Sequence, residues 1–286
     1  MKKALISILT MICMLTSCQN NVNRNNVELI KAPISVGLGT LDISFNLPVP
    51  LYRTENDSIP FDTLSFEQNR NGSWSYKTRH LKSLEPYIMF YGDSDKEAQG
   101  RINGGLVPFL PQLAFRVLKE NDSCYCVVVN EKSFETVIIR KNPDYDVLPQ
   151  RGDCFGVDGI KYDYQKKLYF TETQGKTKQN TTRKYYKGYY VYETWEHLLK
   201  RALFVGFNDN YAVYDAPEGE KIFENTNHDF IPIPYKVTEV RGNWIKVKKF
   251  NSKEFNTKDI NNAEGWVIWK NDKEMLVSIT EDYAID

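Results

Sequence analysis

Apolar and polar residues alternate along much of the chain, and this period-two pattern is typical of β-strands. The segment 41–47 places an apolar residue at every second position and stops before Pro48, which predicts a half-buried strand. Residues 61–68 and 73–77 flank Asn71-Gly72, a dipeptide that supplies the positive φ angles of a tight hairpin turn. The pattern therefore predicts an all-β fold.

Only two short helices interrupt this pattern. Ser94 followed by Glu97 predicts a capping box that opens a helix ending near Asn103. The acidic residues at 93, 95 and 97 imitate the start of a calcium loop, but Ala98 occupies the position that needs glycine, so helix capping is the better interpretation. Residues 194–202 predict an amphipathic helix that packs a linker against a neighbouring unit.

A weak repeat organises the rest of the chain. Phe115-Arg116-Val117, followed by Cys124-Tyr125-Cys126-Val127, matches Tyr235-Lys236-Val237, followed at the same spacing by Trp244-Ile245-Lys246-Val247. Each run then reaches a short apolar strand that ends in a basic residue, 137–140 in the first copy and 267–270 in the second, after a gap about ten residues longer in the second. The repeat predicts two small barrels of similar build, preceded by an N-terminal β-hairpin region.

The N-terminus has the features of an export signal. Lys2 and Lys3 precede an apolar run over 4–15 of about twelve residues, shorter than the roughly 20 that cross a bilayer, so residues 1–17 are predicted to be a signal peptide. Leu15-Thr16-Ser17-Cys18 resembles the bacterial lipobox, which implies that Cys18 carries diacylglycerol and other acyl chains and holds the protein on a membrane.

The residues after the cysteine refine this expected location. The segment 18–35 begins with a polar, Asn-rich stretch and is predicted to be a flexible tether. In the Asn-rich, Tyr-rich bacterial lipoproteins that the chain resembles, export to the cell surface is often associated with acidic residues just after the cysteine. None directly follows Cys18, so the resemblance favours the periplasmic face of the outer membrane over the cell surface. The sequence thus places the protein in the cell envelope.

Composition narrows the choice of partner. The chain has 37 basic and 37 acidic residues, and loss of Lys2 and Lys3 with the signal leaves a net charge of −2. A near-neutral protein lacks the basic stripe that nucleic acid requires. The basic segment 159–188 could be read as a site for an anionic polymer, but its Thr, Gln, Gly and Asn content favours a solvated hairpin or loop.

The second copy resembles a bacterial SH3-like module over residues 203–286. The landmarks, in order, are 214–219, 235–240, Gly242-Asn243-Trp244 and Gly265-Trp266-Val267, with a longer loop than usual at 251–262. The resemblance implies a domain division into 36–150, a β domain with a divergent SH3-like barrel; 151–202, a polar hairpin or loop with a linker helix; and 203–286. Residues 192–196 together with Trp266, Trp269 and 275–277 also resemble a group of gut-type Bacteroidetes lipoproteins that brings no activity with it.

The candidate binding residues lie in this second copy. Tyr214, Trp244, Trp266 and Trp269 are flat aromatic side chains that can stack on peptide or sugar. The first copy has Cys124 in place of Trp244, so an aromatic groove is expected in the second copy alone. Trp266 and Trp269 are three residues apart in a strand and point to opposite faces, so at least one of them is expected in the core.

The cysteines and histidines suggest no metal or cofactor. Cys124 and Cys126 share one face of a strand, so they are predicted to be buried free thiols, with a disulfide from either to Cys154 as the alternative. The only histidines, at 80, 197 and 228, are too scattered for zinc.

Catalysis is the weaker functional hypothesis. Gly152-Asp153-Cys154 superficially resembles the nucleophile motif of cell-wall cysteine peptidases, but Gly156 and Gly159 break the helix that such a cysteine needs. The sequence favours a non-enzymatic, membrane-anchored binding or assembly module whose partner is peptidoglycan, another peptide or an envelope protein. The alternative is a cell-envelope hydrolase, cysteine peptidase-like, with an SH3-like targeting domain.

Overall fold

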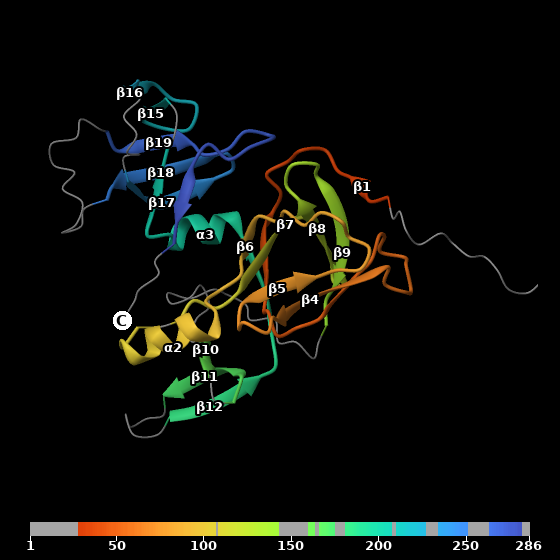
Figure 1. The fold of residues 1–286 in the computed structure, drawn as a ribbon. Coiled ribbons are helices and arrows are strands. Elements are labelled where there is room, and N and C mark those ends of the chain that lie inside the picture. The colour runs from red at the N-terminus through yellow and green to blue at the C-terminus, as the bar shows by residue number, and fades with distance from the viewer. Residues whose placement is uncertain are drawn as a thin grey trace, which may run out of the picture.

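The computed structural model describes residues 28–106, 108–142, 160–163, 166–174, 181–207, 210–226, 234–250 and 263–281. The described chain is an all-β protein built from antiparallel sheets with two short helices, as the alternating pattern predicts. Within these residues no strand pairing closes either of the large sheets into a barrel. Two of the sheets have seven strands each, and Figure 1 shows them on either side of one helix.

The first large sheet has the strand order β1-β9-β8-β7-β2-β13, with β6 paired to β7. Its strands are β1 (Ile30–Lys31), β2 (Gly39–Ile43), β6 (Ile88–Phe90), β7 (Gln112–Glu120), β8 (Cys124–Asn130), β9 (Glu135–Arg140) and β13 (Tyr190–Thr194). β1 lies inside the segment predicted to be a tether, so the chain joins the sheet by Ile30, through its pairing with Thr136.

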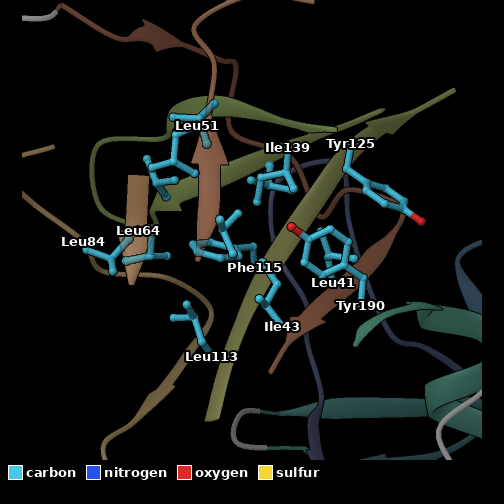
Figure 2. Close-up of a cluster of buried hydrophobic side chains, with 14 of the residues drawn as sticks. Leu41, Ile43, Leu51, Leu64, Leu84, Leu113, Phe115, Tyr125, Ile139 and Tyr190 are labelled. Atoms are coloured by element: carbon cyan, nitrogen blue, oxygen red, sulfur yellow. The ribbon is translucent and has the colours of Figure 1, made fainter. Parts of the chain in front are cut away.

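A three-stranded sheet covers one face of the first large sheet. It consists of β3 (Val49–Leu51), β4 (Asp62–Gln68) and β5 (Trp74–Lys77). Leu51 and Leu64 from this small sheet enter the same core as Leu41, Phe115 and Ile139 from the large one, as Figure 2 shows. The small sheet and the first large sheet therefore share one core, and together we call them the first unit.

The strand β2 is shorter and more buried than its alternating sequence predicts. It ends at Ile43, and all five of its residues are buried. The alternation indicates one exposed face, but β2 lies between β7 and β13, and its polar residues Thr40 and Asp42 are covered as well. The prediction of a half-buried strand is wrong because the pattern carries no information on what packs against the polar face.

The second large sheet has the order β16-β15-β19-β18-β17-β14-β20. Its strands are β14 (Phe204–Gly206), β15 (Tyr211–Tyr214), β16 (Lys221–Asn225), β17 (Tyr235–Arg241), β18 (Trp244–Lys249), β19 (Gly265–Ile268) and β20 (Ser278–Thr280). Their inward residues, among them Val213, Ile245 and Val267, form a separate core. The sheet thus has its own hydrophobic interior.

Helix α3 (Trp195–Arg201) follows directly after β13 and leads into β14. The Thr194 hydroxyl caps it by accepting a hydrogen bond from the backbone N–H of His197, and Trp195, Leu198 and Leu199 are buried. These three side chains belong to the core of the second sheet. The predicted amphipathic linker helix is confirmed, and it is the element that joins the two sheets (Figure 1).

Both copies of the repeat have the same strand register. Val117 pairs with Val127 and Val237 with Val247, and a bulge follows in each copy, at Leu118 and at Thr238. The equivalent residues are 120 positions apart in β7, β8, β17 and β18. A β-bulge is a specific local irregularity, so its recurrence at the same place makes the two meanders equivalent in structure.

The third strand of the repeat is aligned differently from the sequence prediction. Cys126 pairs with Ile138, and its equivalent Lys246 pairs with Trp266. Val137 and Ile138 therefore correspond to Gly265 and Trp266, an offset of 128, whereas the sequence comparison matched Val137 with Val267. The sequence alignment of this strand is therefore wrong by two residues. A shift of two residues leaves every side chain on the same face of the sheet, so the apolar pattern fits both alignments equally well.

The polar segment before β13 forms its own small sheet. It contains β10 (Ile160–Asp163), β11 (Leu168–Gln174) and β12 (Thr181–Tyr186), paired antiparallel in that order. Tyr169 packs with Phe45 and Val191 in a third apolar cluster. The predicted hairpin is thus a three-stranded meander fixed to the first unit.

The hairpin of β4 and β5 is confirmed, but its turn is longer than predicted. The last strand pair is Gln68 with Trp74, and Asn69 N–H donates to the Ser73 carbonyl. Gly72 alone has a positive φ there, of 83°.

Helix α2 (Asp95–Asn103) has the predicted capping box, in which Ser94 and Glu97 bond reciprocally.

The buried carboxylate of Asp62 organises the segment after β5. It accepts four backbone N–H bonds of 2.7–2.9 Å, from Thr63, Arg79, His80 and Leu81. Burial alone would raise the pKa of Asp62, but these four donors lower it below its usual value. Folding therefore favours the ionised form of this side chain.

Replacing Asp62 with alanine is expected to lower the free energy of unfolding by about 3 kcal/mol, because several N–H groups lose a charged acceptor. Since the folded-state pKa is lowered, the contribution is complete above the unfolded pKa of about 4 and is lost as pH falls through the folded value. Urea unfolding at neutral and acidic pH measures both effects. Asp122→Ala, at an exposed turn position, is the control; equal effects of the two substitutions would contradict the assignment.

Candidate functional site

Three of the four aromatic residues singled out in the sequence lie on one face of the second sheet. Tyr214 and Lys246 each pair with Trp266, and Trp244 pairs with Ile268. Residues directly opposite each other on paired strands point to the same side of a sheet. Their neighbours Val213, Ile245 and Val267 point the other way, into the core, so the three aromatic residues share the outer face.

Trp269 does not belong to this face. It is 2% exposed and lies in the core of the second sheet. Its indole N–H donates to the Gly242 carbonyl at 2.9 Å, which satisfies the buried donor. Trp269 is therefore structural, and the sequence expectation that Trp266 and Trp269 point to opposite sides agrees with these contacts.

Trp266 lies on the outer face but is covered by its neighbours. The Arg241 guanidinium lies 4.8 Å from the Trp266 ring centroid and the Lys246 ammonium 5.9 Å from it, so only 4% of Trp266 is exposed. Arg241 Nε donates to Glu239 Oε1 at 2.6 Å, in a pair that is itself exposed. Exposed ion pairs contribute little, so a ligand can displace the arginine at small cost.

Tyr214 and Trp244 form the open part of the face. Their rings are 5.2 Å apart between centroids with an interplanar angle of 88°, an edge-to-face contact, and both side chains are half-buried. Ile268, paired with Trp244, is 36% exposed. We define the aromatic face as Tyr214, Arg241, Trp244, Lys246, Trp266 and Ile268.

The sequence analysis missed the two cations of this face. Arg241 pairs with Trp244 and Lys246 with Trp266, so both become neighbours of the aromatic rings only through strand pairing. Two signals could have identified them. Side chains alternate along a strand, so residues 244, 246 and 248 share one face of β18. The register of the repeat pairs Arg241 of β17 with Trp244 and so adds Arg241 to the same face. Cations beside half-buried aromatic rings are the groups that stack on flat ligands and pair with carboxylates.

The equivalent face of the first copy is closed by its own residues. Tyr52 pairs with Ile138 as Tyr214 pairs with Trp266. The Arg140 guanidinium lies 4.3 Å from the Tyr52 ring centroid and donates to the carbonyl oxygens of Glu55 and Asp57. Of these two equivalent faces, as far as the described residues show them, the one in the first copy is thus closed by Arg140.

The thiols show no sign of activation. Cys124 is buried, Cys126 is half-buried, and both are free. Burial raises the pKa of the Cys126 thiol, which disfavours the reactive thiolate. Cys18 and Cys154, and with them the predicted lipid site, the alternative disulfide and the peptidase-like motif, lie outside the described residues.

Among the described residues no group of three or more His, Cys, Asp or Glu side chains is placed to hold a metal ion. His197 lies in α3, where its Nδ1 is 2.6 Å from Glu193 Oε1, and the same carboxylate binds Arg201. His197 is thus part of an ion-pair network. Within the same residues, neither helix is long and apolar enough to cross a membrane.

Comparison with known proteins gives no relative. No protein-family model, no curated protein and no solved structure matches the chain.

Proposed function

We propose that the chain is a lipid-anchored protein of the cell envelope that binds a wall component or an envelope protein without catalysis. The aromatic face of the second sheet carries this proposal. It offers two half-buried rings, Tyr214 and Trp244, beside the cations Arg241 and Lys246. Flat groups and carboxylates occur together in wall peptides and in acidic protein segments, which makes these the favoured ligands.

The membrane attachment rests on the N-terminal motif alone. The apolar run 4–15, followed by Leu15-Thr16-Ser17-Cys18, supports acylation of Cys18 and location on the outer membrane. In the SH3-like interpretation the second copy is the binding module, and the first, whose equivalent face is closed by Arg140, has a scaffold role. The anchor keeps this binding face close to the membrane.

The proposal predicts the effect of one substitution. Trp244→Ala is expected to weaken binding of the full chain to its envelope ligand about tenfold, because the half-buried ring on the outer face is lost while the core remains. The measurement is a pulldown on purified peptidoglycan and, in parallel, on detergent-solubilised envelope proteins. Trp266→Ala is unsuitable here, because Trp266 is buried and its removal also tests folding.

Ile222→Ala is the matched control. Ile222 lies on the neighbouring strand β16 and is 52% exposed, yet it is not part of the aromatic face. Retention by the parent chain and the control, with loss by Trp244→Ala, supports the proposal. Equal retention of all three chains would overturn it, and cleavage of peptidoglycan that Cys154→Ser abolishes would favour the hydrolase alternative.

A further inference from the structure

A second aromatic site lies in the first unit, far from the aromatic face in sequence. It is a shallow cavity of about 360 Å³ lined by Trp74, Ser75, Tyr76 and Tyr91. Trp74 to Tyr76 come from β5 of the small sheet, whereas Tyr91 directly follows β6 of the first large sheet. The cavity therefore lies where two sheets meet, a frequent position for small-ligand sites.

The rings of this cavity are held in place from behind. The Trp74 ring packs edge-to-face on Phe45, with 4.7 Å between centroids, and Phe45 packs in the same way on Tyr169 at 6.0 Å. Tyr76 and Tyr91 are nearly parallel, with an interplanar angle of 11° and centroids 6.0 Å apart. Tyr91 is 41% exposed, so the cavity offers a fixed aromatic surface to solvent.

A chain of uncharged polar groups runs from Ser75 in β5 into the β4–β5 turn. The Ser75 hydroxyl donates to Asn69 Oδ1 at 3.3 Å, the Asn69 amide donates to the Ser73 hydroxyl at 3.0 Å, and that hydroxyl donates to Asn71 Oδ1 at 2.6 Å. Side chains alternate along β5, so the Ser75 hydroxyl lies on the opposite side of the strand from the Trp74 and Tyr76 rings. These bonds therefore fix the β4–β5 turn and, through it, the position of the two rings.

The lining is also neutral. None of the four lining residues carries a charge at neutral pH, and the pKa of Tyr91 is raised by burial and by its neighbour Tyr76. A charged ligand would find no counter-ion in the cavity wall, whereas the aromatic face of the second sheet has two cations. The two surfaces therefore select different ligand chemistry.

We propose that the cavity formed by Trp74, Ser75, Tyr76 and Tyr91 binds a neutral saccharide. A sugar ring presents a flat patch of C–H groups to an aromatic side chain and hydroxyl groups at its rim, which matches the aromatic rings of the cavity and the phenol groups of Tyr76 and Tyr91. The rival occupant is an extended peptide on β5, which among the described strands pairs with β4 on one side and with none on the other. The shallow, ring-lined and uncharged cavity favours the sugar.

The test is a titration of the full chain, in a detergent without a sugar headgroup, with neutral hexasaccharides of glucose, xylose, mannose and N-acetylglucosamine. Tryptophan fluorescence and calorimetry measure binding. At least one of these neutral probes is expected to bind, and Tyr91→Ala is expected to weaken that binding about tenfold. Trp74→Ala is the second variant, with circular dichroism to check its fold, because Trp74 also packs on Phe45.

Phe90→Ala is the matched control, since Phe90 is adjacent in sequence and similarly exposed but does not line the cavity. Binding that is unchanged in Phe90→Ala and in Trp244→Ala, and about tenfold weaker in Tyr91→Ala, supports the site independently of the proposed function. The site is overturned if no neutral probe binds, if Tyr91→Ala binds as well as the parent chain, or if hexagalacturonate or an extended peptide is the ligand that Tyr91→Ala loses.

Discussion

Arg201→Ala is expected to lower the free energy of unfolding by about 3–5 kcal/mol, because it leaves two buried carboxylates without their counter-ion. Arg201 in α3 donates to both oxygens of Glu193, at 2.5 and 2.8 Å, and to Glu281 Oε2 at 2.7 Å. Glu193 is 3% exposed and lies in β13 of the first sheet, while Glu281 directly follows the last strand of the second. The arginine thus connects both sheets.

Lys200→Ala is the control on the same helix. Lys200 pairs with Glu196 at 2.7 Å, but both side chains are about half exposed, so the expected loss is below about 1 kcal/mol. Urea unfolding followed by circular dichroism measures both variants. A loss for Arg201→Ala as small as that for Lys200→Ala would contradict the counter-ion role.

Trp195→Ala is the second substitution with a large expected effect, a loss of about 3–5 kcal/mol. The indole is buried in the core of the second sheet, and its N–H donates to the Val36 carbonyl of the first unit at 2.9 Å. The ring also packs edge-to-face on Tyr87 at 5.2 Å and lies 5.7 Å from the Arg116 guanidinium. Its removal leaves a cavity where the two units meet.

Calorimetry distinguishes this role from that of an ordinary core residue. The parent chain is expected to unfold in one transition, because α3 links the two cores, whereas Trp195→Ala is expected to show two. Trp195→Phe keeps much of the packing and loses one hydrogen bond, so about 1–2 kcal/mol of the stability is expected to be lost. Two transitions in the parent chain would show that α3 does not couple the units.

Local sequence signals predicted the local structure well. Ser94 and Glu97 form the capping box, and the helix after Thr194 buries the predicted face. The repeat in β7, β8, β17 and β18 was also visible in the sequence, because a fixed spacing of apolar residues survives in both copies. Each of these features depends on residues close together in the chain.

The features that sequence reasoning missed depend on distant residues. The cover of Trp266 comes from Arg241, on a strand that does not pair with it directly. The four donors to Asp62, three of them 17 to 19 residues away, follow no short pattern. The ion-pair network of Arg201 joins residues 80 apart. The alternation of apolar and polar residues predicts the face of the sheet on which a side chain lies, but it does not predict which residues cover that face.

The shared register of the two meanders has a consequence for synthesis of the chain. Two segments that pair in the same way within one polypeptide can exchange strands during folding, and such misassembly is typical of repeat proteins. The differences between the copies oppose this exchange. β18 paired in place of β8 would bring Trp244 to the site of Cys124, beside Arg140, which already stacks on Tyr52. The sequence differences between the copies therefore favour pairing of each strand within its own sheet.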